Sequence, residues 1–233
     1  MKRTIIIPLL FCLSLIAMAQ TNKDQEKNNY LIPVDKEQER QFIQDDLSLS
    51  FYAEEISRLL IPSNAAFGVI FRPSLFSESS ITCDTQRRLL MYTTVDDGKT
   101  IWGCVCDATE VIEDGVERMR DKPENYQAPM MKTYSLTISN DALKHLLNLW
   151  SAAIGAAKPL QGDQNVLDGI GREFFINGKY ARTHRGSIKE GRILRLLNLI
   201  GDLRQAIIDG DSVRAEKVCQ ESVSLTKEFE SLK

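Results

Sequence analysis

The sequence predicts an α+β protein in which antiparallel β-meanders and hairpins pack against amphipathic helices and the chain closes in an αα-hairpin. Two observations carry this prediction. Short apolar or alternating runs are joined by Asp-Gly and Asn-Gly pairs, which favour hairpin turns because glycine accepts a positive φ. Longer segments repeat apolar residues every three or four positions, as a helix with one buried face does. Such elements pack as a sheet covered by helices.

Residues 1–19 have the features of a secretory signal peptide. A basic start precedes an apolar run from Ile5 to Ile16, and Ala17-Met18-Ala19 forms an A-x-A cleavage site. The apolar run is too short to span a bilayer. We therefore expect cleavage near Ala19, a secreted or periplasmic location, and no integral membrane insertion.

The remaining chain has the composition of a globular protein. The full sequence is 43% hydrophobic and 26% charged, and its net charge of -3 becomes -5 once the signal peptide is removed. This charge gives no indication of nucleic-acid binding. We expect a flexible tether over residues 20–34, which are polar and contain Pro33, followed by a single α+β domain over residues 35–233.

The first half of the domain is expected to contain one helix and then a meander. The helix covers residues 35–60, with a break near Ser48–Ser50, and ends at Ile61-Pro62. Strands are expected, in order, over residues 65–71, 80–84, 88–95 and 99–106. The last two would form a hairpin through Asp97-Gly98.

The second half begins with residues 107–131, which leave two alternatives open: residues 110–120 form either another Asp-Gly hairpin or a short helix, followed by a loop. The later elements are expected to be a strand over 132–138, a helix capped by Ser139 or Asn140, a hairpin of 170–176 with 179–184 through Asn177-Gly178, a helix begun by a capping box of Ser187 and Glu190, and a last helix capped by Asp211.

Four cysteines lie beyond the expected signal peptide. In an oxidising compartment an even number favours disulfides. Cys104 and Cys106 are two apart in the expected fourth strand, and a bridge between them would strain the backbone. We therefore expect a disulfide between Cys83 and either Cys104 or Cys106.

No catalytic residue, cofactor or metal site is predicted. The chain lacks G-x-S-x-G, H-E-x-x-H, Walker A, C-x-x-C and G-x-G-x-x-G, and its two histidines are too few for a histidine-rich metal site. A cysteine nucleophile would need an adjacent histidine, yet His145 lies in a predicted helix away from the cysteines. Trp102 and Trp150 are expected in the core.

One segment departs from the acidic background. Between Arg172 and Arg195 seven basic residues stand against two acidic ones, which leaves net -10 for the rest of the mature chain. The candidate binding residues within or beside this hairpin and the following helix are Arg182, His184, Arg185, Lys189 and Arg192. Arginine offers bidentate contacts to carboxylate or phosphate groups. The alternative is that these side chains pair with the protein's own acidic surface.

From Phe67 onward the chain carries a "FRPSLF" turn, a tryptophan-bearing segment, "LLNLWSAAI", and "LDG" before an aromatic-rich hairpin and terminal helices. In this order of features it resembles small secreted proteins of uncharacterised families from Gram-negative gut bacteria. The resemblance implies an exported α+β protein and no established activity.

Three functions remain open on sequence alone. The leading hypothesis is an exported non-enzymatic binding or accessory protein whose partner is an unknown protein or an anionic component of the cell envelope. The first alternative is a secreted hydrolase of cell-wall or glycan material, which would require a deep pocket with convergent titratable groups. The second is a periplasmic inhibitor or immunity-type protein.

Overall fold

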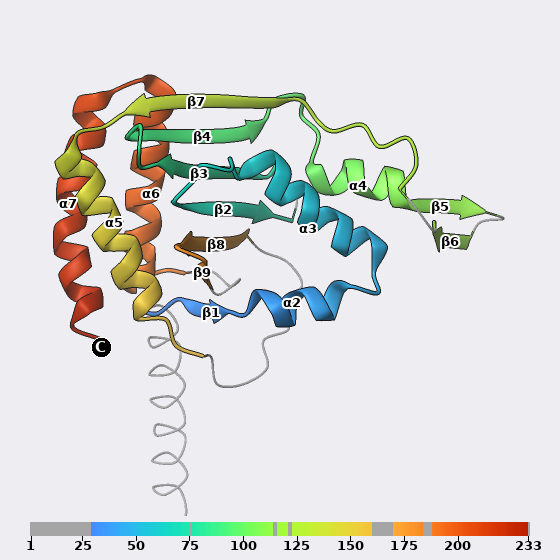
Figure 1. Ribbon diagram of the computed structural model, residues 1–233, viewed down its shortest axis with the longest axis horizontal. Coiled ribbons are helices and arrows are strands. Elements are labelled where there is room, and N and C mark those ends of the chain that lie inside the picture. The colour runs from blue at the N-terminus through green and yellow to red at the C-terminus, as the bar shows by residue number, and fades with distance from the viewer. Residues whose placement is uncertain are drawn as a thin grey trace, which may run out of the picture.

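The protein is an α+β fold built around a seven-stranded antiparallel sheet (Figure 1). A computed structural model describes residues 29–74, 76–113, 116–120, 123–159, 170–183 and 188–232. The strands are β1 (Ile32–Val34), β2 (Phe67–Pro73), β3 (Ser79–Asp84), β4 (Leu89–Val95), β5 (Glu110–Glu113), β6 (Val116–Met119), β7 (Met131–Thr137), β8 (Ile170–Ile176) and β9 (Lys179–Arg182). The helices are α2 (Lys36–Ile43), α3 (Leu47–Leu60), α4 (Ile101–Thr109), α5 (Asn140–Gly155), α6 (Gly191–Asp209) and α7 (Ser212–Glu230).

The strand order in the main sheet is β1-β9-β8-β2-β3-β4-β7, so β1 and β7 form its two edges (Figure 1). The β8–β9 hairpin turns at Asn177 and Gly178, which have φ values of 49° and 73°. Positive φ at both central residues is the geometry of a type I′ turn. The sequence prediction of this hairpin, and of the β2–β3–β4 meander, is confirmed.

Helices cover both faces of the sheet. Phe67 and Val69 of β2 point into the larger hydrophobic cluster, to which α5, α6 and α7 contribute. Ile70, the residue after Val69, belongs to a second cluster with residues of α3 and α4. Because side chains alternate along a strand, these two clusters lie on opposite faces of the sheet. The terminal α6 and α7 pack together as the predicted αα-hairpin, joined at Gly210.

The sheet approaches α5 closely at one glycine. The Trp150 indole Nε1 donates to the Gly68 carbonyl oxygen at 2.9 Å. A Cβ at Gly68 would lie 2.5 Å from the Ile81 carbonyl oxygen and 2.9 Å from the Phe175 ring. Only glycine therefore fits between the Phe175 ring and β3.

Two of the predicted helix caps form: the Ser139 side chain accepts from the Ala142 N–H, and the Asp211 side chain accepts from the Arg214 N–H. A further cap, which the sequence did not predict, is Asp46, whose side chain accepts from the Leu49 N–H. Because Asp46 starts α3, the predicted single helix over residues 35–60 is divided into two between Gln44 and Asp46, slightly before the expected break.

The predicted strand over residues 99–106 is wrong, because this segment is the helix α4. Thr100 caps its first turn, and the buried Glu78 carboxylate accepts the N–H groups of Ile101 at 2.7 Å and Trp102 at 3.0 Å. These acceptors satisfy the amide groups that a helix N-terminus leaves unpaired. Asp97-Gly98 consequently leads into a helix, and β7 occupies the place beside β4.

Three further outcomes concern the remaining elements. The strands β5 and β6 pair antiparallel, which favours the hairpin over the short helix among the two open alternatives. The helix α6 begins at Gly191, and its N-cap Glu190 makes no side-chain cap, whereas Ser187 lies outside the described residues. At the N-terminal end, β1 pairs with β9, so residues 29–34 of the expected tether belong to the fold. Residues 1–28 lie outside the described part.

Within the described residues, no helix is both long and apolar enough to cross a membrane.

Candidate functional site

A buried carboxylate in the middle of the sheet organises the most charged part of the protein. Glu173 of β8 is 3% exposed. Its two oxygens bind two cations from distant segments: Lys36 Nζ at 2.7 Å from Oε1 and Arg72 Nη2 at 2.7 Å from Oε2. A buried carboxylate is costly unless it is paired in this way. The pairing therefore fixes β2, β8 and the start of α2 to one another.

Two further charges complete this group. Lys36 also binds Glu39 at 2.7 Å, and Arg182 lies directly across from Glu173 in the β8–β9 register. Burial alone would raise the pKa of Glu39. The Lys36 hydrogen bond and the charges of Lys36, Arg72 and Arg182 outweigh burial and hold that pKa below its ordinary value. We call these five residues, Lys36, Glu39, Arg72, Glu173 and Arg182, the Glu173 cluster.

Arg182 differs from the other two cations of the Glu173 cluster. Lys36 and Arg72 are engaged by Glu173, whereas Arg182 is exposed and forms no ion pair within 4.0 Å inside the described part of the chain. Three cations and two carboxylates leave the cluster one positive charge. That charge is presented to solvent at Arg182.

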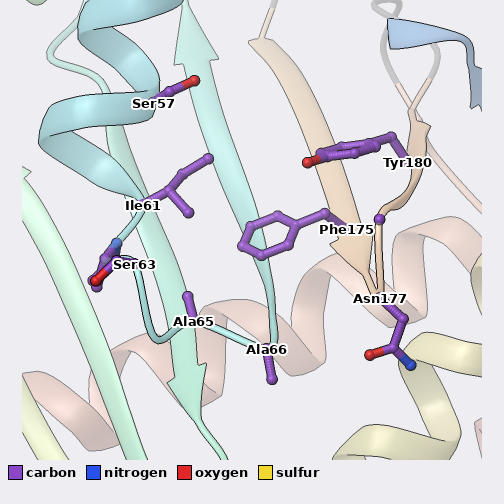
Figure 2. A pocket seen from close by; sticks show the side chains of 10 residues that line it. Ser57, Ile61, Ser63, Ala65, Ala66, Phe175, Asn177 and Tyr180 are labelled. Carbon is purple, nitrogen blue, oxygen red and sulfur yellow. The ribbon is translucent and has the colours of Figure 1, made fainter.

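An open hollow of about 500 Å³ lies on the same face of the sheet, between the end of α3 and the β8–β9 turn (Figure 2). The Phe175 and Tyr180 rings line it, with centroids 6.1 Å apart, and Ser57, Ser63 and Asn177 also border it. None of its described lining residues carries a carboxylate, an imidazole or a thiol. The hollow therefore lacks the convergent titratable groups that the hydrolase hypothesis requires.

Tyr180 connects the hollow to the Glu173 cluster. The Lys36 Nζ lies 5.1 Å from the centroid of the Tyr180 ring, a cation–π geometry. Tyr180 and Arg182 alternate with Ala181, so they point to the same face of β9. The exposed cation and the aromatic side of the hollow are therefore neighbours on one surface.

The structure separates the candidate basic residues that it describes. Arg182 lies on the face covered by α3 and α4, whereas Arg192 begins α6, which packs on the opposite face. Glu228 of α7 engages the α6 arginines, with its carboxylate 3.9 Å from Arg192 and 2.6 Å from Arg195. Lys189 is exposed just before α6. His184 and Arg185 lie outside the described residues.

Arg192 and Arg195 of α6 thus pair with an acidic side chain of the protein itself, as the alternative interpretation of the basic segment predicts. The sequence does not reveal Lys36, Glu39 and Arg72 as members of the site, because they lie far along the chain from the basic segment. One signal was present: a glutamate between apolar residues in a strand needs a cation partner when both faces of that strand are buried.

The predicted disulfide does not form. Within the described residues, neither Cys104 nor Cys106 is bonded to Cys83. Cys83 points into the cluster beneath α5, α6 and α7, whereas Cys104 and Cys106 lie on α4 at the other face of the sheet. The sheet itself therefore separates the expected partners.

Neither of the most deeply buried thiols is suited to nucleophilic catalysis. Burial raises the pKa of both Cys83 and Cys219 to about 12. The thiolate is the nucleophile, so these two groups are almost wholly in the unreactive thiol form at neutral pH. Across the described ranges, no three histidine, cysteine or acidic side chains are placed to hold a metal ion.

We expect alkylation of the native mature protein by iodoacetamide to modify Cys106 before Cys83 or Cys219. Cys106 is partly exposed, whereas the other two are fully buried with raised pKa values. Mass spectrometry of tryptic peptides measures the order of labelling, and the denatured protein, in which all four thiols react, is the control. Equal native rates, or a disulfide in the unreduced protein, would contradict this arrangement.

The chain matches no protein-family model, no curated protein and no solved structure. The resemblance to small secreted proteins consequently adds no activity, and any function has to be argued from the site itself.

Proposed function

We propose that the mature chain is an exported, non-enzymatic binding or accessory protein that recognises an anionic group of a macromolecular partner or cell-envelope component through Arg182. The observation that carries the proposal is the charge imbalance of the Glu173 cluster. Its buried carboxylate already engages Lys36 and Arg72, while Arg182 remains exposed beside it.

The surroundings of Arg182 support the same proposal. A guanidinium can contact carboxylate or phosphate through two parallel N–H donors. The adjacent hollow, with its aromatic rings, hydroxyls and Asn177 amide, offers room for the uncharged part of a ligand. Export is proposed from the A-x-A signal peptide, with cleavage near Ala19 placing the mature protein in the periplasm or outside the cell.

Titration with inorganic phosphate and with succinate, followed by ¹H–¹⁵N NMR, tests the anion site. We expect the largest amide shifts at Tyr180–Thr183, and we expect Arg182→Gln to weaken binding of either anion about tenfold or more, as loss of a charge-assisted hydrogen bond does. Arg192→Gln is the matched control, because Arg192 is paired with Glu228 on the other face of the sheet.

The two variants distinguish the possible results. Shifts that survive in Arg182→Gln, or that disappear in Arg192→Gln, would show that the site is misplaced. Absence of any shift with both anions would remove the proposal of an anion site altogether. Retention of partners from an envelope extract, compared between Arg182→Glu and Arg192→Glu, extends the same comparison to macromolecules.

A further inference from the structure

The two edges of the sheet are protected very differently (Figure 1). The edge strand β1 spans only Ile32–Val34 and contains Pro33, which has no N–H to offer. The preceding Leu31 carbonyl already accepts the Lys158 N–H at 2.9 Å. At the opposite edge, β7 has seven residues and no proline. An unprotected edge of this length is a template for another strand.

The hydrogen bonds at the ends of β7 show which of its backbone groups face outward. The Asp96 N–H donates to Met130 O at 2.8 Å, and the Ile138 N–H donates to Arg88 O at 3.0 Å. In an antiparallel ladder hydrogen-bonded pairs alternate, and Tyr92 is opposite Tyr134 in the same phase. The even-numbered residues of β7 therefore bond to β4.

The odd-numbered residues consequently direct their N–H and C=O groups to the open edge. They are Met131, Thr133, Ser135 and Thr137. Within the described residues these outward groups have no backbone partner. The neighbouring elements β4 and α6 lie on the inner side and on one face of β7, so they leave the edge itself uncovered.

We infer that β7 pairs antiparallel with β7 of a second copy of this chain, about a two-fold axis at Tyr134. This register places Met131 opposite Thr137 of the second copy, and Thr133 opposite Ser135. Odd-numbered residues then meet odd-numbered residues, so all four outward N–H groups and all four outward C=O groups on each strand find partners. Registers centred one residue away leave part of this set unpaired.

The side chains of β7 suit that register. Tyr134 meets Tyr134 of the second copy on one face, and the hydroxyl pair of Thr133 and Ser135 lies on the other. Lys132, the single charged residue of β7, is opposite Leu136. The two lysines are then about 13 Å apart along the strands, a separation at which salt screens their repulsion. Because the β1 edges are blunted, assembly stops at a closed dimer.

Sedimentation velocity and light scattering of the mature chain, over a range of micromolar concentrations, test this inference. We expect a dimer, and we expect Ser135→Pro to raise its dissociation constant about tenfold or more, because each dimer loses two backbone donors. The lost N–H faces outward, so the monomer fold is retained and circular dichroism is unchanged. A wild-type chain that is monomeric throughout, even if it binds another protein's strand, overturns the inference.

A pair of double variants tests the register without proline. Thr133→Lys with Ser135→Lys places lysine opposite lysine twice, and we expect a monomer. Thr133→Lys with Ser135→Asp places lysine opposite aspartate twice, and we expect a dimer. Both pairs alter the same exposed positions. Equal dimerisation of the two would refute this register, and neither variant touches Arg182, so the result is independent of the anion site.

Discussion

Replacing Trp150 with alanine is expected to lower the free energy of unfolding by about 3–5 kcal/mol. Trp150 is 1% exposed, and its ring centroid lies 5.2 Å from that of Phe67 and 6.1 Å from that of Phe174. It also donates the hydrogen bond to Gly68 that ties α5 to β2. The substitution therefore removes a large buried surface together with a buried hydrogen bond between α5 and β2.

Urea unfolding followed by circular dichroism measures this effect, and Trp102 supplies the matched control. Trp102 is 37% exposed, and its ring meets that of Tyr52 edge-on with a distance of 5.2 Å between the ring centroids. We expect Trp102→Ala to cost about 1 kcal/mol or less. Should Trp150→Ala fail to fold, Trp150→Phe keeps most of the ring and still loses the hydrogen bond. Equal costs for the two alanine variants would contradict the difference in burial.

The parts of the fold that the sequence predicts correctly are those with local signals. Asn177-Gly178 specifies its turn through backbone conformations that few other residue pairs adopt. Ser139 and Asp211 mark helix starts by accepting from the first turn of their own helices. In each case the deciding interaction spans only a few residues, so its pattern is visible in the chain.

The error over α4 has the opposite cause. The segment carries alternating apolar residues, but its buried positions Ile101, Cys104, Val105 and Ala108 also have helical spacing. Glu78 decides between the two, because its carboxylate pairs with the first amides of the helix. Glu78 lies 23 residues before Ile101, so the local pattern of residues 99–106 does not indicate this contact.

The candidate site shows the same division. Alternation along β9 assigns Tyr180 and Arg182 to one face from the sequence alone. The role of Glu173 depends on Arg72, 101 residues away, and on Lys36. No pattern in the sequence places Lys36, at the start of the expected first helix, beside the hairpin. The excess of positive charge is therefore visible in the sequence, whereas the pairing that neutralises most of it is visible only in the fold.

Replacing Glu173 with glutamine is expected to lower the free energy of unfolding by about 2 kcal/mol. Breaking a fully buried ion pair costs roughly 3–5 kcal/mol, because a charge is left without its partner. Here the Lys36 and Arg72 side chains are 30% and 26% exposed, so water offsets part of that loss. Glutamine keeps the shape of glutamate, removes its charge and leaves one acceptor oxygen where glutamate has two.

Glu228 provides the control for this prediction, because its carboxylate also engages two cations but is 36% exposed. We expect Glu228→Gln to cost no more than about 1 kcal/mol. The same urea experiment with Glu173→Gln, Arg72→Gln and the double variant then measures the coupling between the buried partners. Equal losses of stability in Glu173→Gln and Glu228→Gln would show that burial does not strengthen the pairing of Glu173 with Lys36 and Arg72. The explanation for the unpaired charge of Arg182, that Glu173 is already engaged by these two cations, would then be contradicted.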